Sequence, residues 1–165
     1  MKKRFNWNKW TRKTHYWGAF VILLPVSVIF TSGIFLQLKK EINWIQPPTV
    51  SGGLSNNFSV SFDDILAAVQ SVEEAKIQSW NDVDRLDVRV EKGVVKVRGK
   101  NRWEVQVDTH TGEVLHVAYR RSDLIESIHD GSWFHEKVKL WIFLPSGIIL
   151  LTLWITGLYM VILPY

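Results

Sequence analysis

Two long uncharged segments constrain what this chain can fold into. Residues 17–36 form the first and residues 140–165 the second, and neither contains a charged side chain. A bilayer core about 30 Å thick is crossed by roughly 20 apolar residues in a helix. Each segment is therefore long enough to cross a membrane, and the sequence predicts two transmembrane helices.

The charges are divided unevenly along the chain. Six of the 20 Lys and Arg residues lie within residues 1–13, whereas all 16 Asp and Glu residues lie between residues 39 and 139. Basic residues beside a first span keep that end in the cytoplasm. We therefore expect a two-pass membrane protein with both termini cytoplasmic and residues 39–137 extracytoplasmic. Because the basic arm is explained as a topology signal, no nucleic-acid partner is expected.

Several classes of chemistry are excluded by what the sequence lacks. The chain has no cysteine, which excludes disulfides, thiolate catalysis and cysteine-ligated metal centres. It has no phosphate-binding loop, zinc-protease motif or nucleophile elbow. No catalytic residue and no metal site is predicted. Whether the chain forms part of an enzyme stays open.

The region between the spans has the pattern of one small α+β domain. Ser61 followed by Asp64 predicts the start of a helix, which continues towards residues 72–75. After Trp80 the apolar period changes to two, with turns at residues 91–93, 99–101 and 109–112. This predicts a helix packed on an antiparallel meander of about four strands, each with one face towards water. Residues 49–57 are rich in Gly, Ser and Asn and predict a flexible linker.

These features divide the chain into six predicted segments. They are a basic cytoplasmic arm at 1–13, a first transmembrane helix at 14–38, a linker at 39–57, the α+β domain at 58–121, a short amphipathic connecting helix at 122–137 and a second transmembrane helix at 138–165.

Both spans contain an early proline and later small residues. Proline bends a membrane helix, and small residues let two helices approach closely. The predicted helix-packing residues are Pro25, Gly33, Pro145, Gly147 and Gly157. Pairing within the chain, pairing with another membrane protein or a second copy, and ordinary membrane composition all remain open as explanations.

Three histidines lie near the ends of the spans. His15 is at the cytoplasmic end of the first span, and His129 and His135 precede the second. Haem b between helices is held by imidazoles on facing helices. At a rise of 1.5 Å per residue, His15 lies about 30 Å from the other two, so one chain cannot bring them to one iron. A symmetric dimer would be needed; the alternative is that these histidines make polar contacts at helix ends.

The order of several short motifs resembles the PepSY-associated transmembrane family in its small two-helix form. The first span resembles the family's pattern through RKTHYW at residues 12–17 and TSG at 31–33. WEVQVD at 103–108 with TGEV at 111–114 resembles the end of a PepSY domain, and IHDG at 128–131 with TG at 156–157 resembles the second span. Tyr16 departs from the family's pattern, which has Arg there. The resemblance covers nearly the whole chain from Arg12 onwards.

The resemblance implies a PepSY domain at residues 58–121, a kind of module regarded as binding or inhibitory rather than catalytic. Larger four-span relatives include haem-bearing inner-membrane reductases of ferric siderophores. We therefore expect a non-enzymatic accessory or interaction subunit of an inner-membrane complex, linked to iron uptake or redox. Its expected partners are the lipid bilayer, a membrane protein or a second copy, and a periplasmic protein or peptide, which could add a strand to the exposed sheet edge.

Two other functions follow from the same resemblance. The chain could be an electron-transfer component that binds haem b through His15 and His129 or His135 and passes electrons to ferric or flavin acceptors. It could also be a peptidase inhibitor. The interaction subunit requires no cofactor, whereas the electron-transfer component requires haem b.

Overall fold

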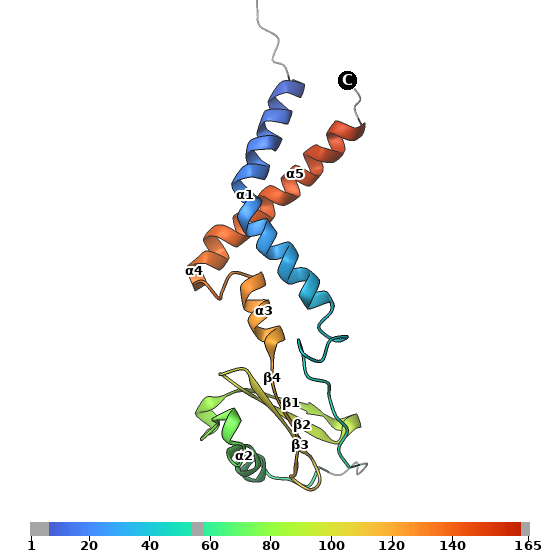
Figure 1. The fold of residues 1–165 in the computed structure, drawn as a ribbon, viewed down its shortest axis with the longest axis vertical. Coiled ribbons are helices and arrows are strands. Elements are labelled where there is room, and N and C mark those ends of the chain that lie inside the picture. Colours follow the sequence, from blue (N-terminus) through green and yellow to red (C-terminus); the bar gives the residue numbers. More distant parts are fainter. Residues whose placement is uncertain (1–6, 54–57, 163–165) are drawn as a thin grey trace, which may run out of the picture. The chain divides into compact units, whose positions relative to one another are not determined.

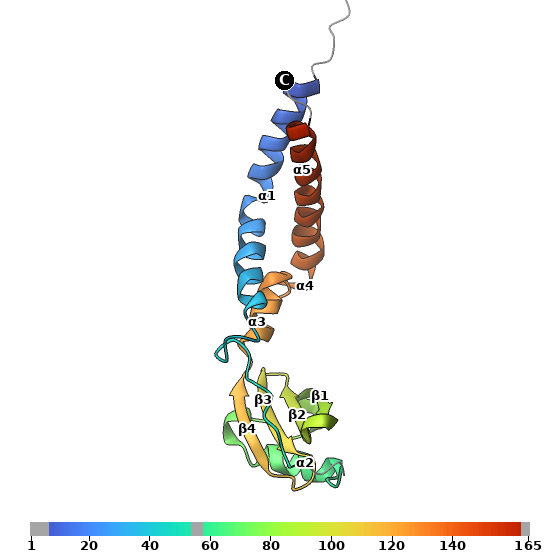
Figure 2. The same cartoon turned by 90° about the vertical axis from the view of Figure 1, so that its right-hand side faces the viewer.

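The structure, a computed structural model, describes residues 7–53 and 58–162. The chain forms two compact units. Residues Gln37–Leu124 make up one unit, called here the sheet domain. Residues Met1–Leu36 and Ile125–Tyr165 belong to the other, called here the helical unit. Figures 1 and 2 show the elements of both.

Two long apolar helices dominate the helical unit. Helix α1 (Trp7–Gln37) contains Pro25 and begins within the predicted basic arm. The second span is built from α4 (Glu136–Val138), the π-helical turn η4 (Lys139–Phe143) and α5 (Leu144–Ile162). The segments Lys9–Gln37 and Glu136–Ile162 are each long and apolar enough to cross a membrane. Most of their large apolar side chains are exposed within the chain, as expected for helices that contact lipid.

The sheet domain contains the predicted meander. Strands β1 (Val83–Arg89), β2 (Val94–Gly99), β3 (Trp103–Asp108) and β4 (Val114–Tyr119) pair antiparallel in the order β1-β2-β3-β4. The four-stranded sheet and the α+β class are therefore confirmed. Short 3₁₀ turns flank the strands: η1 (Glu73–Ala75), η2 (Trp80–Asp82) and η3 (Val90–Lys92).

Helix α2 (Phe62–Gln70) covers one face of the sheet. Its start is fixed by the predicted capping box, in which the Asp64 N–H donates to Ser61 Oγ at 3.1 Å and the Ser61 N–H donates to Asp64 Oδ2 at 2.8 Å. Ile65 and Val69 are buried against the valines of β2 and β3. The helix ends at Gln70, earlier than predicted, because the chain turns into η1 and buries Ala75 in the same core.

The other face of the sheet is covered by a segment called here the strap, residues 45–53. Figure 2 shows it running along the sheet. The Val50 N–H donates to Gln106 Oε1 at 2.9 Å, and the Gly53 N–H donates to Asp108 Oδ2 at 2.6 Å. The prediction of a flexible linker is therefore wrong for residues 49–53. A side chain at Gly52 would collide with the Gly93 carbonyl and the Asp108 carboxylate, so the glycine permits close approach. Residues 54–57 of that prediction lie outside the described residues.

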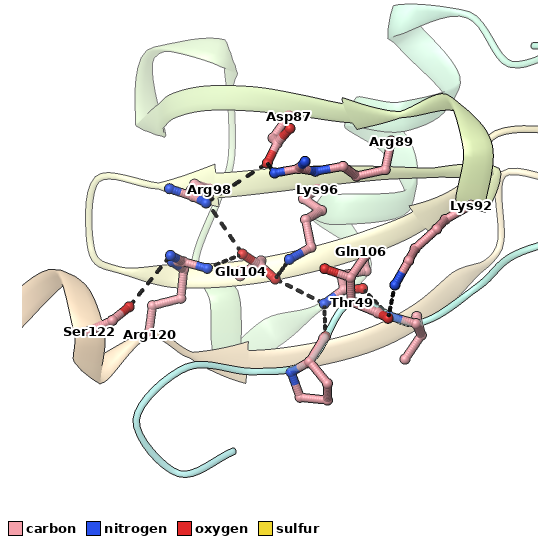
Figure 3. Close-up of polar contacts among 12 residues, drawn as sticks. Thr49, Asp87, Arg89, Lys92, Lys96, Arg98, Glu104, Gln106, Arg120 and Ser122 are labelled. Atoms are coloured by element: carbon pink, nitrogen blue, oxygen red, sulfur yellow. Dashed lines mark hydrogen bonds and ion pairs between the residues drawn. The ribbon is translucent and has the colours of Figure 1, made fainter. Parts of the chain in front are cut away.

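Under the strap lies a buried network of charges, drawn in Figure 3. Glu104 is fully buried and forms ion pairs with Arg120 Nη1 at 2.6 Å, Lys96 Nζ at 3.0 Å and Arg98 Nε at 3.6 Å. Gln106 donates to Glu104 Oε1 at 2.9 Å and to the Pro48 carbonyl of the strap at 2.7 Å. The sequence pattern predicted that these polar residues lie on the face of the sheet towards water. That prediction is wrong for β2 and β3, because the strap covers that face and excludes water from it.

The ion pairs compensate for the burial of these charges. Burial alone would lower the pKa of Arg120, but its contacts with Asp123 and Glu104 raise that pKa, so the guanidinium stays charged. Removing one member of a buried charge cluster is costly because the partners stay buried without their counter-charge.

The first test is the variant Glu104→Gln. It removes the counter-charge of Lys96 and leaves Arg120 with Asp123 alone, so we expect the free energy of unfolding of the sheet domain to fall by about 3–5 kcal/mol. Thermal and urea unfolding of the whole chain in mild detergent, followed by circular dichroism, measures this. Glu113→Gln is the matched control, because Glu113 is exposed, and it should change stability little. Equal stability of both variants would contradict the role assigned to Glu104.

Candidate functional site

The candidate site consists of two contacts in the helical unit, each made by a histidine, a hydroxyl and the glycine that follows it. In the first, His129 at the end of α3 (Arg121–His129) contacts Ser32 and Gly33 of α1. In the second, His15 of α1 contacts Thr156 and Gly157 of α5. Two of the predicted packing glycines and two of the predicted histidines are thus brought together in pairs.

The hydrogen bonds of His129 define its tautomer. Its Nδ1 lies 3.1 Å from the Ile29 carbonyl, which can only accept, so Nδ1 carries the hydrogen. The Ser32 hydroxyl donates to the Val28 carbonyl at 2.6 Å and so offers a lone pair to the same Nδ1–H at 3.0 Å. The lone pair of the neutral ring is therefore on Nε2.

His15 Nδ1 faces a hydroxyl rather than a carbonyl. The Thr156 hydroxyl donates to the Thr152 carbonyl at 2.9 Å and lies 3.2 Å from His15 Nδ1, so its lone pair can accept from an Nδ1–H there. Among the described residues, neither His15 nor His129 has a hydrogen-bond partner at Nε2. A histidine held through Nδ1–H with a free Nε2 is oriented as metal-bound histidines are.

Each of the two rings lies against a glycine. A Cβ atom at Gly33 would be 3.4 Å from His129 Cε1, and one at Gly157 would be 3.7 Å from His15 Cε1. His15 also lines a cavity of about 340 Å³ between α1 and α5, with Trp7, Trp10 and Tyr159 among the other lining residues. Both distances are ordinary van der Waals contacts, so each ring packs directly on its glycine.

His135 differs from the other two. It caps α4, and its Nδ1 accepts from the Lys137 N–H at 3.0 Å. The neutral ring therefore carries its hydrogen on Nε2 and has no lone pair there. His135 makes the helix-end hydrogen bond that was one of the two interpretations open from the sequence.

The two histidine sites are far apart. His129 contacts Ser32, which lies 17 residues after His15 on α1, a separation of about 25 Å along a helix. One chain therefore supplies one histidine at each site. The prediction that a single chain cannot place both on one iron agrees with this geometry.

A turn fixes the approach of His129 to α1. Gly131 has φ +81°, and a Cβ there would lie within 2.6 Å of the Phe143 ring, so only glycine fits. Lys139 Nζ donates to Asp130 Oδ2 at 2.7 Å across the same turn. Burial alone would raise the pKa of Asp130, but hydrogen bonds from Lys139 and Ser132 outweigh it and lower that pKa to about 2. The carboxylate therefore stays ionised at any pH near neutrality.

The remaining predicted packing residues have different surroundings. A Cβ atom at Gly147 would meet nothing within 4 Å, so its predicted packing role would require another molecule and stays a prediction. Pro25 lies inside α1 and Pro145 is the second residue of α5, after the π-helical turn η4. Their packing roles also remain predictions.

Two functional contacts were missed from the sequence. Gly18 packs against α5, where a Cβ would lie 3.0 Å from Leu153 Cδ2, and Ser32 holds His129. The usable signal was that Ser32 directly precedes Gly33 as Thr156 directly precedes Gly157.

The described residues offer little else for chemistry. Within residues 7–53 and 58–162, no group of three or more His, Cys, Asp or Glu side chains could hold a metal ion.

Two membrane-spanning helices joined by a small α+β domain define the chain as a small membrane-anchored protein. Residues 12–163 match the model of the PepSY-associated TM region, so the chain belongs to this family. No curated protein and no solved structure matches the chain.

A second test concerns the helix contact at Gly18. Gly18→Leu should push α5 away, because a side chain there overlaps Leu153, at a cost of about 1–3 kcal/mol. The chain lacks cysteine, so Thr14→Cys with Thr152→Cys, which line one groove, can report proximity through a short bismaleimide cross-link. Cross-linking should fall strongly in Gly18→Leu. The control Gly147→Leu should cross-link normally, and equal cross-linking in all three proteins would contradict the contact.

Proposed function

We propose that the chain is a non-enzymatic interaction subunit of a bacterial inner-membrane complex that serves iron uptake or redox. Its sheet domain would lie in the periplasm and bind a partner there. The observation that carries this proposal is a clamp between the chain segments that enter and leave the sheet domain.

The clamp joins residues that are far apart in sequence. The Ser122 N–H donates to the Ile45 carbonyl at 2.8 Å, and Arg121 Nη1 donates to the Trp44 carbonyl at 3.2 Å. The Arg121 guanidinium also lies 4.6 Å from the centre of the Trp44 ring. Next to it, Arg120 is bound to buried Glu104. A partner that binds the sheet domain would therefore act on both connections to the spans together.

Exposed aromatic residues support a partner-binding surface. Phe62 on α2 is 66% exposed, and Trp80 packs edge-to-face against it at 6.0 Å between ring centres. Phe58 is also exposed nearby in the sequence. Aromatic side chains that stay in water on a small domain are typical anchors of protein interfaces. We therefore propose Phe62 and Trp80 as the contact for the periplasmic partner.

This proposal is tested with a single introduced cysteine beside the aromatic pair. Asp63→Cys should react in intact cells with a membrane-impermeant maleimide that carries a photoreactive group, and illumination should give a cross-linked partner. Adding Phe62→Ser should abolish the cross-link but not the labelling. Lys13→Cys, in the basic segment, should not be labelled. Labelling of Lys13→Cys but not of Asp63→Cys would show the opposite orientation in the membrane. A cross-link that survives Phe62→Ser would refute the contact.

A second function is favoured by the free Nε2 atoms of His15 and His129. A dimer would bring two such histidines together at each site, with the lone pairs available and the rings held by Ser32 and Thr156. These residues fit a b-type haem at each end of the helix pair. When bound, haem would supply one-electron transfer. His15 and His129 would hold it, whereas His135 would not, because its Nδ1 is already an acceptor.

A visible spectrum separates the two functions. For the interaction subunit we expect protein purified from haem-replete cells to be colourless. A Soret band that is lost in His15→Ala or His129→Ala, and kept in His135→Ala, would replace this proposal with the electron-transfer function. A Soret band that persists in all three variants would contradict the assignment of these histidines as ligands.

A further inference from the structure

A basic groove lies in the sheet domain between the strap and strands β1 and β2. Its volume is about 770 Å³, within the 300–1,000 Å³ range common for small-molecule sites. Its charged lining residues are Lys40, Arg89, Lys92, Lys96, Arg98 and Glu91. Five cations thus face one anion, and neither the helix pair nor the aromatic surface uses them.

The cations on the floor of the groove are closely spaced and share their acids. Glu104 is shared by Lys96, Arg98 and Arg120, while Asp87 lies 3.9 Å from Arg98 and Asp123 lies 3.1 Å from Arg120. Arg98 Nε is buried and has no hydrogen-bond partner among the described residues. Burial lowers the pKa of Arg98, and the charges of Arg120 and Arg85 lower it further despite Asp123 and Glu104. A negative ligand near Arg98 would offset the repulsion from Arg120 and Arg85.

The rim of the groove adds three further cations. Arg89 pairs with Asp87 at 2.8 Å, on a side chain that is about half exposed. Lys92 donates to the Thr49 carbonyl of the strap at 3.2 Å, which leaves two of its three N–H donors for another group. Lys40 makes no ion pair with any described residue. Floor and rim together present guanidinium and ammonium groups around one hollow.

We propose that this groove binds a small oxyanion through its carboxylate or phosphate groups. Arginine and lysine bind these groups by charge-assisted hydrogen bonds, and arginine does so in a bidentate fork. The ligand is either a soluble di- or tricarboxylate or phosphate, or the phosphate of a lipid headgroup. This inference is independent of the partner-binding and haem functions and can fail while either of them stands.

The test uses the full chain in a neutral detergent. Isothermal titration at low ionic strength with citrate, with inorganic phosphate and with short-chain dihexanoyl phosphatidylglycerol measures binding. We expect at least one of these probes to bind with one-site stoichiometry and to weaken as sodium chloride is added, since salt screens exposed charges. Binding of citrate or phosphate identifies a soluble ligand, and binding of the lipid alone identifies a headgroup.

Charge variants of the lining residues locate the binding. Each unit charge at about 4 Å in water contributes roughly 1 kcal/mol, or about fivefold in affinity. Lys40→Gln with Arg89→Gln should therefore weaken binding by about 25-fold. Glu91→Gln should strengthen it about fivefold. Lys100→Gln, an exposed lysine outside the groove, should leave it unchanged.

Because all four substituted lining and control residues are exposed, the variants should fold as the unmodified chain does, and circular dichroism checks this. The proposal is overturned if none of the three probes binds. It is also overturned if Lys100→Gln weakens binding as much as the double variant, or if Glu91→Gln fails to strengthen it.

Discussion

The sheet domain depends on one buried carboxylate. Glu104 is fully removed from water, and a charge in that position is tolerated only with strong compensation. Three cations and the Gln106 amide supply it. Those partners come from β2, from β3 and from the chain just after β4, so a single side chain ties together three parts of the domain. The strap then closes over them by accepting from Gln106 at the Pro48 carbonyl.

Much of the fold could be predicted because its signals are local. The capping box at Ser61 and Asp64, the period-two alternation of β2 and β3, and the uncharged runs of both spans each determine structure through near neighbours. The strap could not be predicted in this way. Two adjacent glycines are equally typical of a flexible segment and of a segment packed closely on another part of the chain. The packed arrangement depends on the Gly93 carbonyl and the Asp108 carboxylate, which are distant in sequence.

The candidate site could be predicted in part. Both histidines of the site and both glycines beside them were identified from their types and positions, because polar residues and glycines are informative near the ends of apolar helices. Ser32 gave no comparable signal, since a serine in a membrane helix can satisfy its own hydroxyl by donating to the carbonyl four residues earlier, as Ser32 does to Val28. Its second role, as an acceptor for His129, depends on the return of the chain through α3.

The strap also changes where the sheet domain begins. Asp108, in the turn that resembles the family's most characteristic motif, accepts from the N–H groups of His110 and Thr111 within the turn and from Gly53 of the strap. A soluble fragment cut at residue 58 would lose that third donor and uncover the charges around Glu104. A piece that keeps both the clamp and the strap therefore starts no later than residue 44. The strap and the turn are therefore one structural unit, although more than fifty residues separate Gly53 from Asp108.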